Sequence, residues 1–173
     1  MRKMMYLFPL VVLYFACNVQ PENPFLAKWD TPFETPPFNE IKNEHFMPAF
    51  LKTMEMEKAE IDAIVNNPEA PTFKNTIEAY EKTGKKLSRV SRVFGCLNGA
   101  NTNDTLQNIS KELAPIRSKH FDDIILNEKL FTKVKQIYVN KDNLGLNEEQ
   151  LTLLENIYKN LELIYPPACQ KFR

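Results

Sequence analysis

An all-α fold is the class that this sequence predicts, and three observations support it. Apolar residues recur three and four positions apart over long stretches, which is the period of an amphipathic helix. Glycine is scarce and proline plentiful, with 4 and 12 residues, and the prolines cluster at 21–37, 68–71 and 166–167. Between these breaks the pattern is helical. It predicts an antiparallel helical lobe of about five helices over residues 38–162, preceded by a signal segment and a Pro-rich linker.

Length and composition fit one globular domain. A chain of 173 residues can bury roughly two-thirds of its unfolded surface. The hydrophobic fraction of 43% and the charged fraction of 25% are ordinary, so disorder is not expected. Basic and acidic side chains number 22 each, and no basic stripe occurs, which argues against a nucleic-acid partner.

Residues 1–16 have the pattern of an export signal. Arg2 and Lys3 form a positive start, and Met4–Ala16 is an apolar run. As a helix this run would span about 20 Å, which is short of the roughly 30 Å of a bilayer core. A signal segment therefore fits better than a membrane-spanning helix.

Cys17 is a candidate lipidation site. It follows Ala16, the small-residue–Cys arrangement of bacterial lipoprotein cleavage sites, although Tyr14 and Phe15 depart from the usual preceding residues. Lipid on Cys17 would hold the protein on a membrane surface. We therefore expect a place in the bacterial cell envelope, lipid-anchored or periplasmic after export. A plain secretory signal cleaved near Ala16 and an uncleaved anchor remain alternatives.

The segment 17–37 is rich in proline and has no helical period, so it is expected to be an extended linker. Phe25, Leu26 and Trp29 are the residues that could strap it to the domain, since large apolar side chains avoid water.

The first helix is expected over residues 43–66, with Pro48 in its first turn. Its apolar stripe consists of Met47, Phe50, Leu51, Met54, Ile61 and Val65. Pro71 then excludes helix at Ala70. Asn75 is expected to cap the next helix, with Thr72 as the rival cap, and Phe73 should fill the corner.

The second helix is expected over residues 76–97 as one continuous element. Its stripe consists of Ile77, Tyr80, Leu87, Val90, Phe94 and Leu97. Four basic residues should form a solvated face on its other side. These are Lys85, Lys86, Arg89 and Arg92.

Three further helices follow. Asp104 is expected to cap the third, which Pro115 should kink or split near Leu113. Asn127 and Asn147 are expected to cap the fourth and fifth. The buried positions of the three are Leu106, Ile109, Leu113, Ile116, Ile124, Leu130, Val134, Ile137, Tyr138, Leu151, Leu154, Tyr158 and Leu161.

Three motifs carry a family resemblance. They are Pro71-Thr72-Phe73-Lys74-Asn75-Thr76, Ala100-Asn101-Thr102-Asn103 and Leu113-Ala114-Pro115. In this order and spacing they resemble the N-terminal region of the zinc oligopeptidases of the thimet oligopeptidase and peptidyl-dipeptidase family, in particular the bacterial peptidyl-dipeptidases. The resemblance covers residues 23–161. It implies a helical lobe that packs on a catalytic lobe and walls a channel for short peptides.

The chemistry of that family is hydrolysis by zinc-bound water, which needs the motif His-Glu-x-x-His. This chain has two histidines, His45 and His120, and neither has a second histidine four positions on. We therefore assign no catalytic and no metal-binding residue. Zinc belongs to the full-length family member, and none is expected on this chain.

The resemblance stops soon after Asn160, and residues 163–173 read as an aberrant tail. A frameshift or premature stop is one explanation, and a genuinely divergent C-terminus is the other. The expected function is thus an N-terminal peptidase fragment, inactive alone, whose partner is the missing catalytic lobe. A freestanding helical lipoprotein that acts as a binding module is the alternative, and supply of the catalytic lobe by a separate polypeptide is a third possibility. A lobe of this kind should expose its docking face as an apolar patch.

Overall fold

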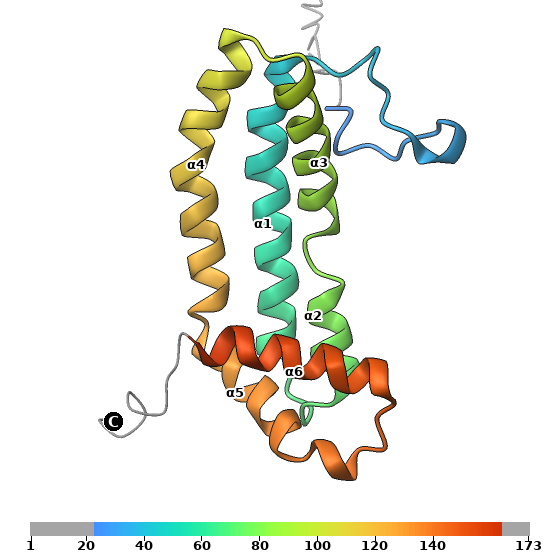
Figure 1. Ribbon diagram of the computed structural model, residues 1–173, viewed down its shortest axis with the longest axis vertical. Coiled ribbons are helices and arrows are strands. Elements are labelled where there is room, and N and C mark those ends of the chain that lie inside the picture. The colour runs from blue at the N-terminus through green and yellow to red at the C-terminus, as the bar shows by residue number, and fades with distance from the viewer. Residues whose placement is uncertain (1–22, 164–173) are drawn as a thin grey trace, which may run out of the picture.

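The computed structural model describes residues 23–163. Outside the described residues lie the predicted export signal, the candidate lipidation site Cys17, Cys169 and residues 164–173 of the expected aberrant tail. Within the described part every regular element is a helix, which confirms the all-α prediction (Figure 1). The α-helices are α1 Phe46–Val65, α2 Ala79–Glu81, α3 Lys85–Ala100, α4 Asp104–Ile125, α5 Glu128–Val139 and α6 Glu148–Glu162.

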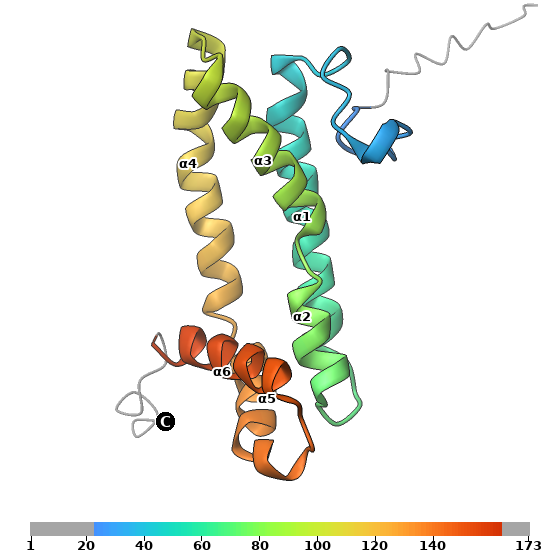
Figure 2. The same ribbon diagram turned by 45° about the vertical axis from the view of Figure 1, so that its right-hand side comes forward.

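Helix α1 is the axis of the molecule. Helix α3 lies along its first half and α4 runs along its length, while α5 and α6 cross its far end (Figures 1 and 2). Since α2 is a single turn, five longer helices remain, as predicted. Among the described helices none is long and apolar enough to cross a membrane.

The caps of the helices follow the sequence closely, with two corrections. Asn127 and Asn147 cap α5 and α6 as predicted, each accepting a backbone N–H bond three residues on. Asn103, one residue before the predicted Asp104, caps α4. Thr72 rather than Asn75 caps the turn after Pro71, because its hydroxyl accepts from the Asn75 N–H at 3.1 Å. The Asn75 side chain answers by accepting from the Thr72 N–H at 2.7 Å.

The prediction of one continuous second helix is wrong. A π-helical turn over Phe73–Glu78 leads into α2, and the helix is interrupted at Gly84 before α3 begins. Gly84 has φ +67°, a left-handed conformation that glycine adopts without the steric cost of a side chain. An apolar stripe at helical period does not reveal this break, because residues on both sides keep the same face inward.

The expected split of α4 at Pro115 does not occur. Proline removes one backbone donor, which would have bonded the carbonyl of Lys111. Both Pro115 and Lys111 are exposed, so water can solvate that carbonyl and the helix continues. Leu51 and Ile116, which were predicted to be buried, are 48% and 37% exposed.

Two separate hydrophobic cores lie along α1. The first core gathers at its beginning and consists of Phe25, Trp29, Phe46, Ala49, Phe50, Met54, Val90, Val93, Phe94, Leu106 and Leu113. The second core gathers at its end and consists of Ile61, Ile64, Val65, Ile77, Ile124, Leu130, Phe131, Val134, Ile137, Leu154, Ile157, Tyr158 and Leu161. The middle of α1, residues 55–60, belongs to neither core.

The linker is strapped to the first core, as predicted, by Phe25 and Trp29. Arg89 holds this part of the linker in place. Its guanidinium lies 3.5 Å from the centre of the Trp29 ring, and its Nη2 donates to the Ala27 carbonyl at 3.0 Å. The prediction that Arg89 belongs to a solvated basic face is therefore wrong, and burial lowers its pKa. Lys85, Lys86 and Arg92 are exposed as expected.

Candidate functional site

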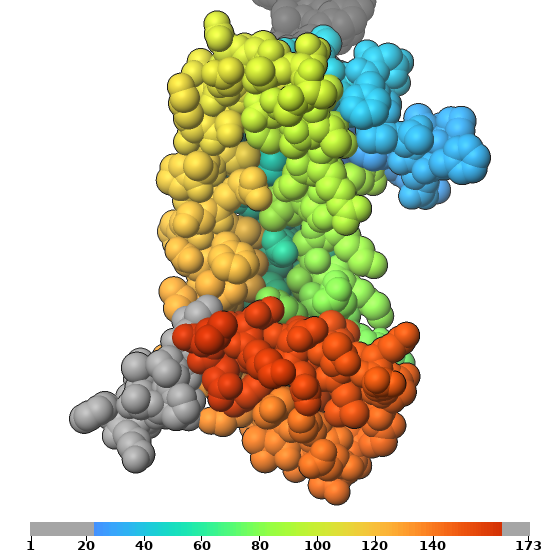
Figure 3. All heavy atoms as spheres, viewed as in Figure 1, coloured from blue at the N-terminus to red at the C-terminus, as the bar shows by residue number. Residues whose placement is uncertain are grey.

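A pocket of about 500 Å³ lies beside the middle of α1, where the two cores separate. Its walls come from α1, from the segment that joins α2 to α3, and from α4. Figure 3 shows this hollow between α3 and α4, with α1 visible at its floor and α6 closing its lower end. We call this hollow the α3–α4 groove. It is one place where the described residues offer space for a ligand or partner.

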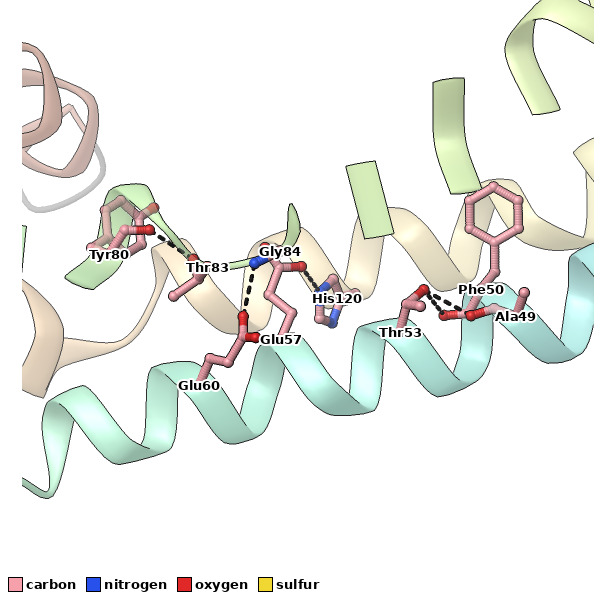
Figure 4. Close-up of polar contacts among 9 residues, drawn as sticks. All are labelled: Ala49, Phe50, Thr53, Glu57, Glu60, Tyr80, Thr83, Gly84 and His120. Atoms are coloured by element: carbon pink, nitrogen blue, oxygen red, sulfur yellow. Dashed lines mark hydrogen bonds and ion pairs between the residues drawn. The ribbon is translucent and has the colours of Figure 1, made fainter. Parts of the chain in front are cut away.

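A contact between a carboxylate and an imidazole crosses the floor of the groove. Oε2 of Glu57 on α1 lies 2.7 Å from Nε2 of His120 on α4. The two side chains are 17% and 14% exposed, so the contact is largely shielded from water. The structure turns His120 inward against α1 (Figure 4).

Gly84 fits tightly against this pair. Its backbone N–H donates to Oε2 of Glu60 at 2.9 Å, and a Cβ on Gly84 would overlap Oε1 of Glu57. Glycine is therefore required here twice, by its positive φ and by the space that Glu57 occupies. Figure 4 shows Gly84, Glu57 and Glu60 together at the break between α2 and α3.

Tyr80 and Thr83 form the wall opposite α4. The Thr83 hydroxyl donates to the Tyr80 carbonyl at 2.8 Å, which closes the end of α2. Burial raises the pKa of the Tyr80 phenol, and the negative charges of Glu57 and Glu81 raise it further. The phenol of Tyr80 therefore stays protonated at neutral pH.

Helix α4 contributes the neighbouring residues Arg117 and Ser118 to the wall of the groove. Phe121 follows them about one helical turn further along. Phe121 is 61% exposed. Within residues 23–163 no hydrogen bond or ion pair engages the guanidinium of Arg117. The groove therefore combines an exposed aromatic ring and a guanidinium that has no polar partner within residues 23–163 with the Glu57–His120 contact at its floor.

The described residues do not fit a zinc site. No group of three or more His, Cys, Asp or Glu side chains within 23–163 is arranged to hold a metal ion. His120 is engaged by Glu57, and Nδ1 of His45 accepts from the backbone N–H of Lys42 at 3.1 Å. Cys96 is exposed. No step of zinc chemistry can be derived from these side chains.

The Glu57–His120 pair could not be found from the sequence. The two residues lie 63 positions apart, on helices whose mutual orientation no local pattern specifies. The available signal was weak: both fall on the inner faces of their helices, in line with Met54 and Ile124.

Comparison with known proteins gives a consistent set of relatives. No protein-family model matches the chain. Over 141 residues, 82% of this chain, it is 39% identical to the dipeptidyl carboxypeptidase of Escherichia coli and 38% identical to that of Salmonella typhimurium. Over the same length it is 24% identical to oligopeptidase A of Escherichia coli. The chain spans about a fifth of the length of these relatives.

Proposed function

Since this chain is homologous to the N-terminal region of the peptidases of the thimet oligopeptidase and peptidyl-dipeptidase family, we propose that it forms the helical lobe of a metallopeptidase that hydrolyses short peptides. The observation that carries the proposal is the 39% identity to dipeptidyl carboxypeptidase over 141 residues. The motifs Pro71–Thr76, Ala100–Asn103 and Leu113–Pro115 lie within the resemblance and support the same assignment.

In this proposal the chain forms part of the wall of the peptide channel and contributes no catalytic residue. It contains no His-Glu-x-x-His, and its described residues offer no metal site. The catalytic lobe would supply the bound metal, the water that it activates and the general base. This lobe corresponds to the part of the relatives' sequences that lies beyond the fifth matched by this chain. The 173-residue chain by itself would then be inactive.

The role of the lobe would be to wall the channel that admits short peptides and excludes folded proteins. Several large apolar side chains remain exposed on α4 and at the end of α6, as a lobe that packs on a larger body requires. They are Ile116, Phe121, Leu126 and Leu163.

A chimera tests this function. In the dipeptidyl carboxypeptidase of Escherichia coli, the region that matches this chain would be replaced by residues 23–163. We expect the chimera to cleave a short fluorogenic peptide and the 173-residue chain with added zinc to leave it intact. Cleavage by the chain alone, abolished by a chelator, would show that the chemistry resides on this chain and would refute the proposal.

We also propose that Cys17 carries a lipid that holds the chain on a membrane surface of the cell envelope. The arrangement Ala16-Cys17 after an apolar run supports it. Expression with labelled palmitate should mark the wild-type chain and leave Cys17→Ser unlabelled. Equal labelling of both chains would show that the lipid is attached to a residue other than Cys17. Labelling of neither chain would favour an ordinary secretory signal.

A freestanding helical binding lipoprotein is the second candidate. The half-open α3–α4 groove favours it, since a pocket of this volume can hold a small ligand as well as a protein segment. An inactive but folded chimera would favour this candidate over the peptidase lobe.

A further inference from the structure

We propose that the α3–α4 groove is the seat for one segment of the catalytic lobe, which inserts an apolar side chain beside Phe121 and a carboxylate against Arg117. The inference rests on the proposed function, because it names the place where the helical lobe meets the catalytic lobe. Three observations lead to it.

The shape of the groove suits an inserted segment. Its volume of about 500 Å³ is that of pockets that enclose whole small ligands, roughly 300–1,000 Å³, so several side chains can enter it. It is bounded on both sides by helices and on its floor by α1 (Figure 3). Within the described residues, helix α4 packs on α1, and few contacts close it against α3.

The chemistry of the groove indicates a protein partner with a negative charge. Phe121 exposes 61% of its surface, and the apolar side chains of Met54 and Leu87 line the same groove. Aromatic residues and arginine are the residue types enriched at the centres of protein interfaces. Because Nε2 of His120 contacts the Glu57 carboxylate at 2.7 Å, Arg117 is the charged side chain of the groove wall that has no hydrogen-bond or ion-pair partner within residues 23–163. A carboxylate is the group that binds a guanidinium with two parallel hydrogen bonds.

The position of the groove points to the catalytic lobe as its occupant. Helix α6 ends beside the lower end of α4 (Figures 1 and 2), and the chain leaves the described part at Leu163, which is 82% exposed. Leu126 at the end of α4 is 53% exposed as well. A polypeptide that continues from this point begins at the foot of the groove. About four-fifths of each relative's length lies outside the match, which leaves ample chain to cover it.

The groove and the rest of the surface can be distinguished by matched variants. Arg117→Glu and Phe121→Ser alter the groove, while Arg92→Glu and Phe38→Ser alter exposed residues of the same types elsewhere. Each variant would be made in the chimera with the Escherichia coli enzyme and in the isolated 173-residue chain. The measurements are the temperature at which the chimera loses peptidase activity and the melting temperature of the chain.

We expect each groove variant to lower the inactivation temperature of the chimera by about 5 °C or more, because a buried interface contact is lost. The same variants should leave the melting temperature of the isolated chain within about 1 °C, since Arg117 has no polar partner among residues 23–163 and Phe121 is largely in water. Both control variants should leave both temperatures unchanged.

Three results would overturn the inference. An active chimera that tolerates the groove variants as well as the controls would show that the catalytic lobe sits elsewhere, while the proposed function stands. A dimer of the isolated chain that Phe121→Ser dissociates would assign the groove to a second copy. A wild-type chimera that folds without activity would remove the proposed function and the inference together.

Discussion

The two hydrophobic cores differ in what they are made of and in how their pieces are brought together. The first core is built on aromatic rings. Phe46 lies 5.0 Å from Phe25 and 5.1 Å from Phe94, and Phe50 lies 5.5 Å from Phe94, measured between ring centres. The second core is largely aliphatic, and its rings gather at one edge, where Tyr138 and Tyr158 stack at 3.8 Å.

Between the two cores the packing gives way to polar contacts. Helix α4 contributes Leu113 to the first core and Ile124 to the second, but residues 114–119 between them are exposed. In that interval Glu57 and His120 join α4 to α1. The comparison shows why the groove exists: one long helix carries two cores that do not merge, and the site lies at the point where they separate.

The largest expected effect is on the first core. Phe46→Ala removes a fully buried ring that contacts Phe25 and Phe94, and should cost about 3–5 kcal/mol of unfolding free energy. The single tryptophan, Trp29, lies in this core, so its fluorescence reports the transition there. Phe33→Ala, at a residue 99% exposed, is the control and should be neutral. Equal destabilisation by both would contradict the packing described.

A comparable truncation in the second core asks whether the cores unfold together. Leu154→Ala removes a fully buried side chain and should cost about 2–5 kcal/mol. Because the two cores do not merge, we expect the loss of helix, followed by circular dichroism, to precede the Trp29 transition. Leu144→Ala, 43% exposed, is the matched control. Coincident transitions in the variant would show that the two cores form one cooperative unit.

Gly84→Ala tests the region between the two cores, where Gly84 packs against Glu57. The positive φ costs roughly 1 kcal/mol for alanine, and displacement of Glu57 from His120 adds a further loss of about 1 kcal/mol. Gly145→Ala provides the reference, because Gly145 also has a positive φ, +61°, but nothing lies within 4 Å of a Cβ there. We expect Gly84→Ala to lower the free energy of unfolding more than Gly145→Ala does, by chemical denaturation. Equal values would mean that the Glu57 contact adds nothing.

The smallest effect concerns the second core at alkaline pH. Burial, followed by the hydrogen bond to Glu162, raises the pKa of Tyr158 to about 12, while an unfolded tyrosine titrates near 10. The folded state therefore holds the proton more tightly, and this contribution to stability is complete below pH 10 and is lost as the pH rises to about 12. Tyr158→Phe should flatten the decline of melting temperature over this range, whereas Tyr138→Phe should not. An unchanged slope in Tyr158→Phe would refute the assignment.

Much of the fold was predictable because it depends on local chemistry. Asn127 and Asn147 cap their helices within three residues of the groups that they bind, and the stripes of α5 and α6 lie on one helical face each. The break at Gly84 was missed because the apolar stripe continues on both sides of it, and the carboxylates of Glu57 and Glu60 against which Gly84 packs come from another helix. The α3–α4 groove was missed because the Glu57–His120 contact joins distant parts of the chain. The contact of Arg89 with Trp29, outside the groove, was missed for the same reason.

The separation of the cores also has a consequence for biosynthesis. The first core needs nothing beyond Leu113, whereas the second needs Leu161. At translation rates of about 5–20 residues per second, the roughly 50 residues between them take some 2–10 s to emerge from the ribosome. The first core can thus close while α5 and α6 are still being made. Newly synthesised chains should then pass through an intermediate in which Trp29 is already buried, while the end of α1 is not yet covered by α5 and α6.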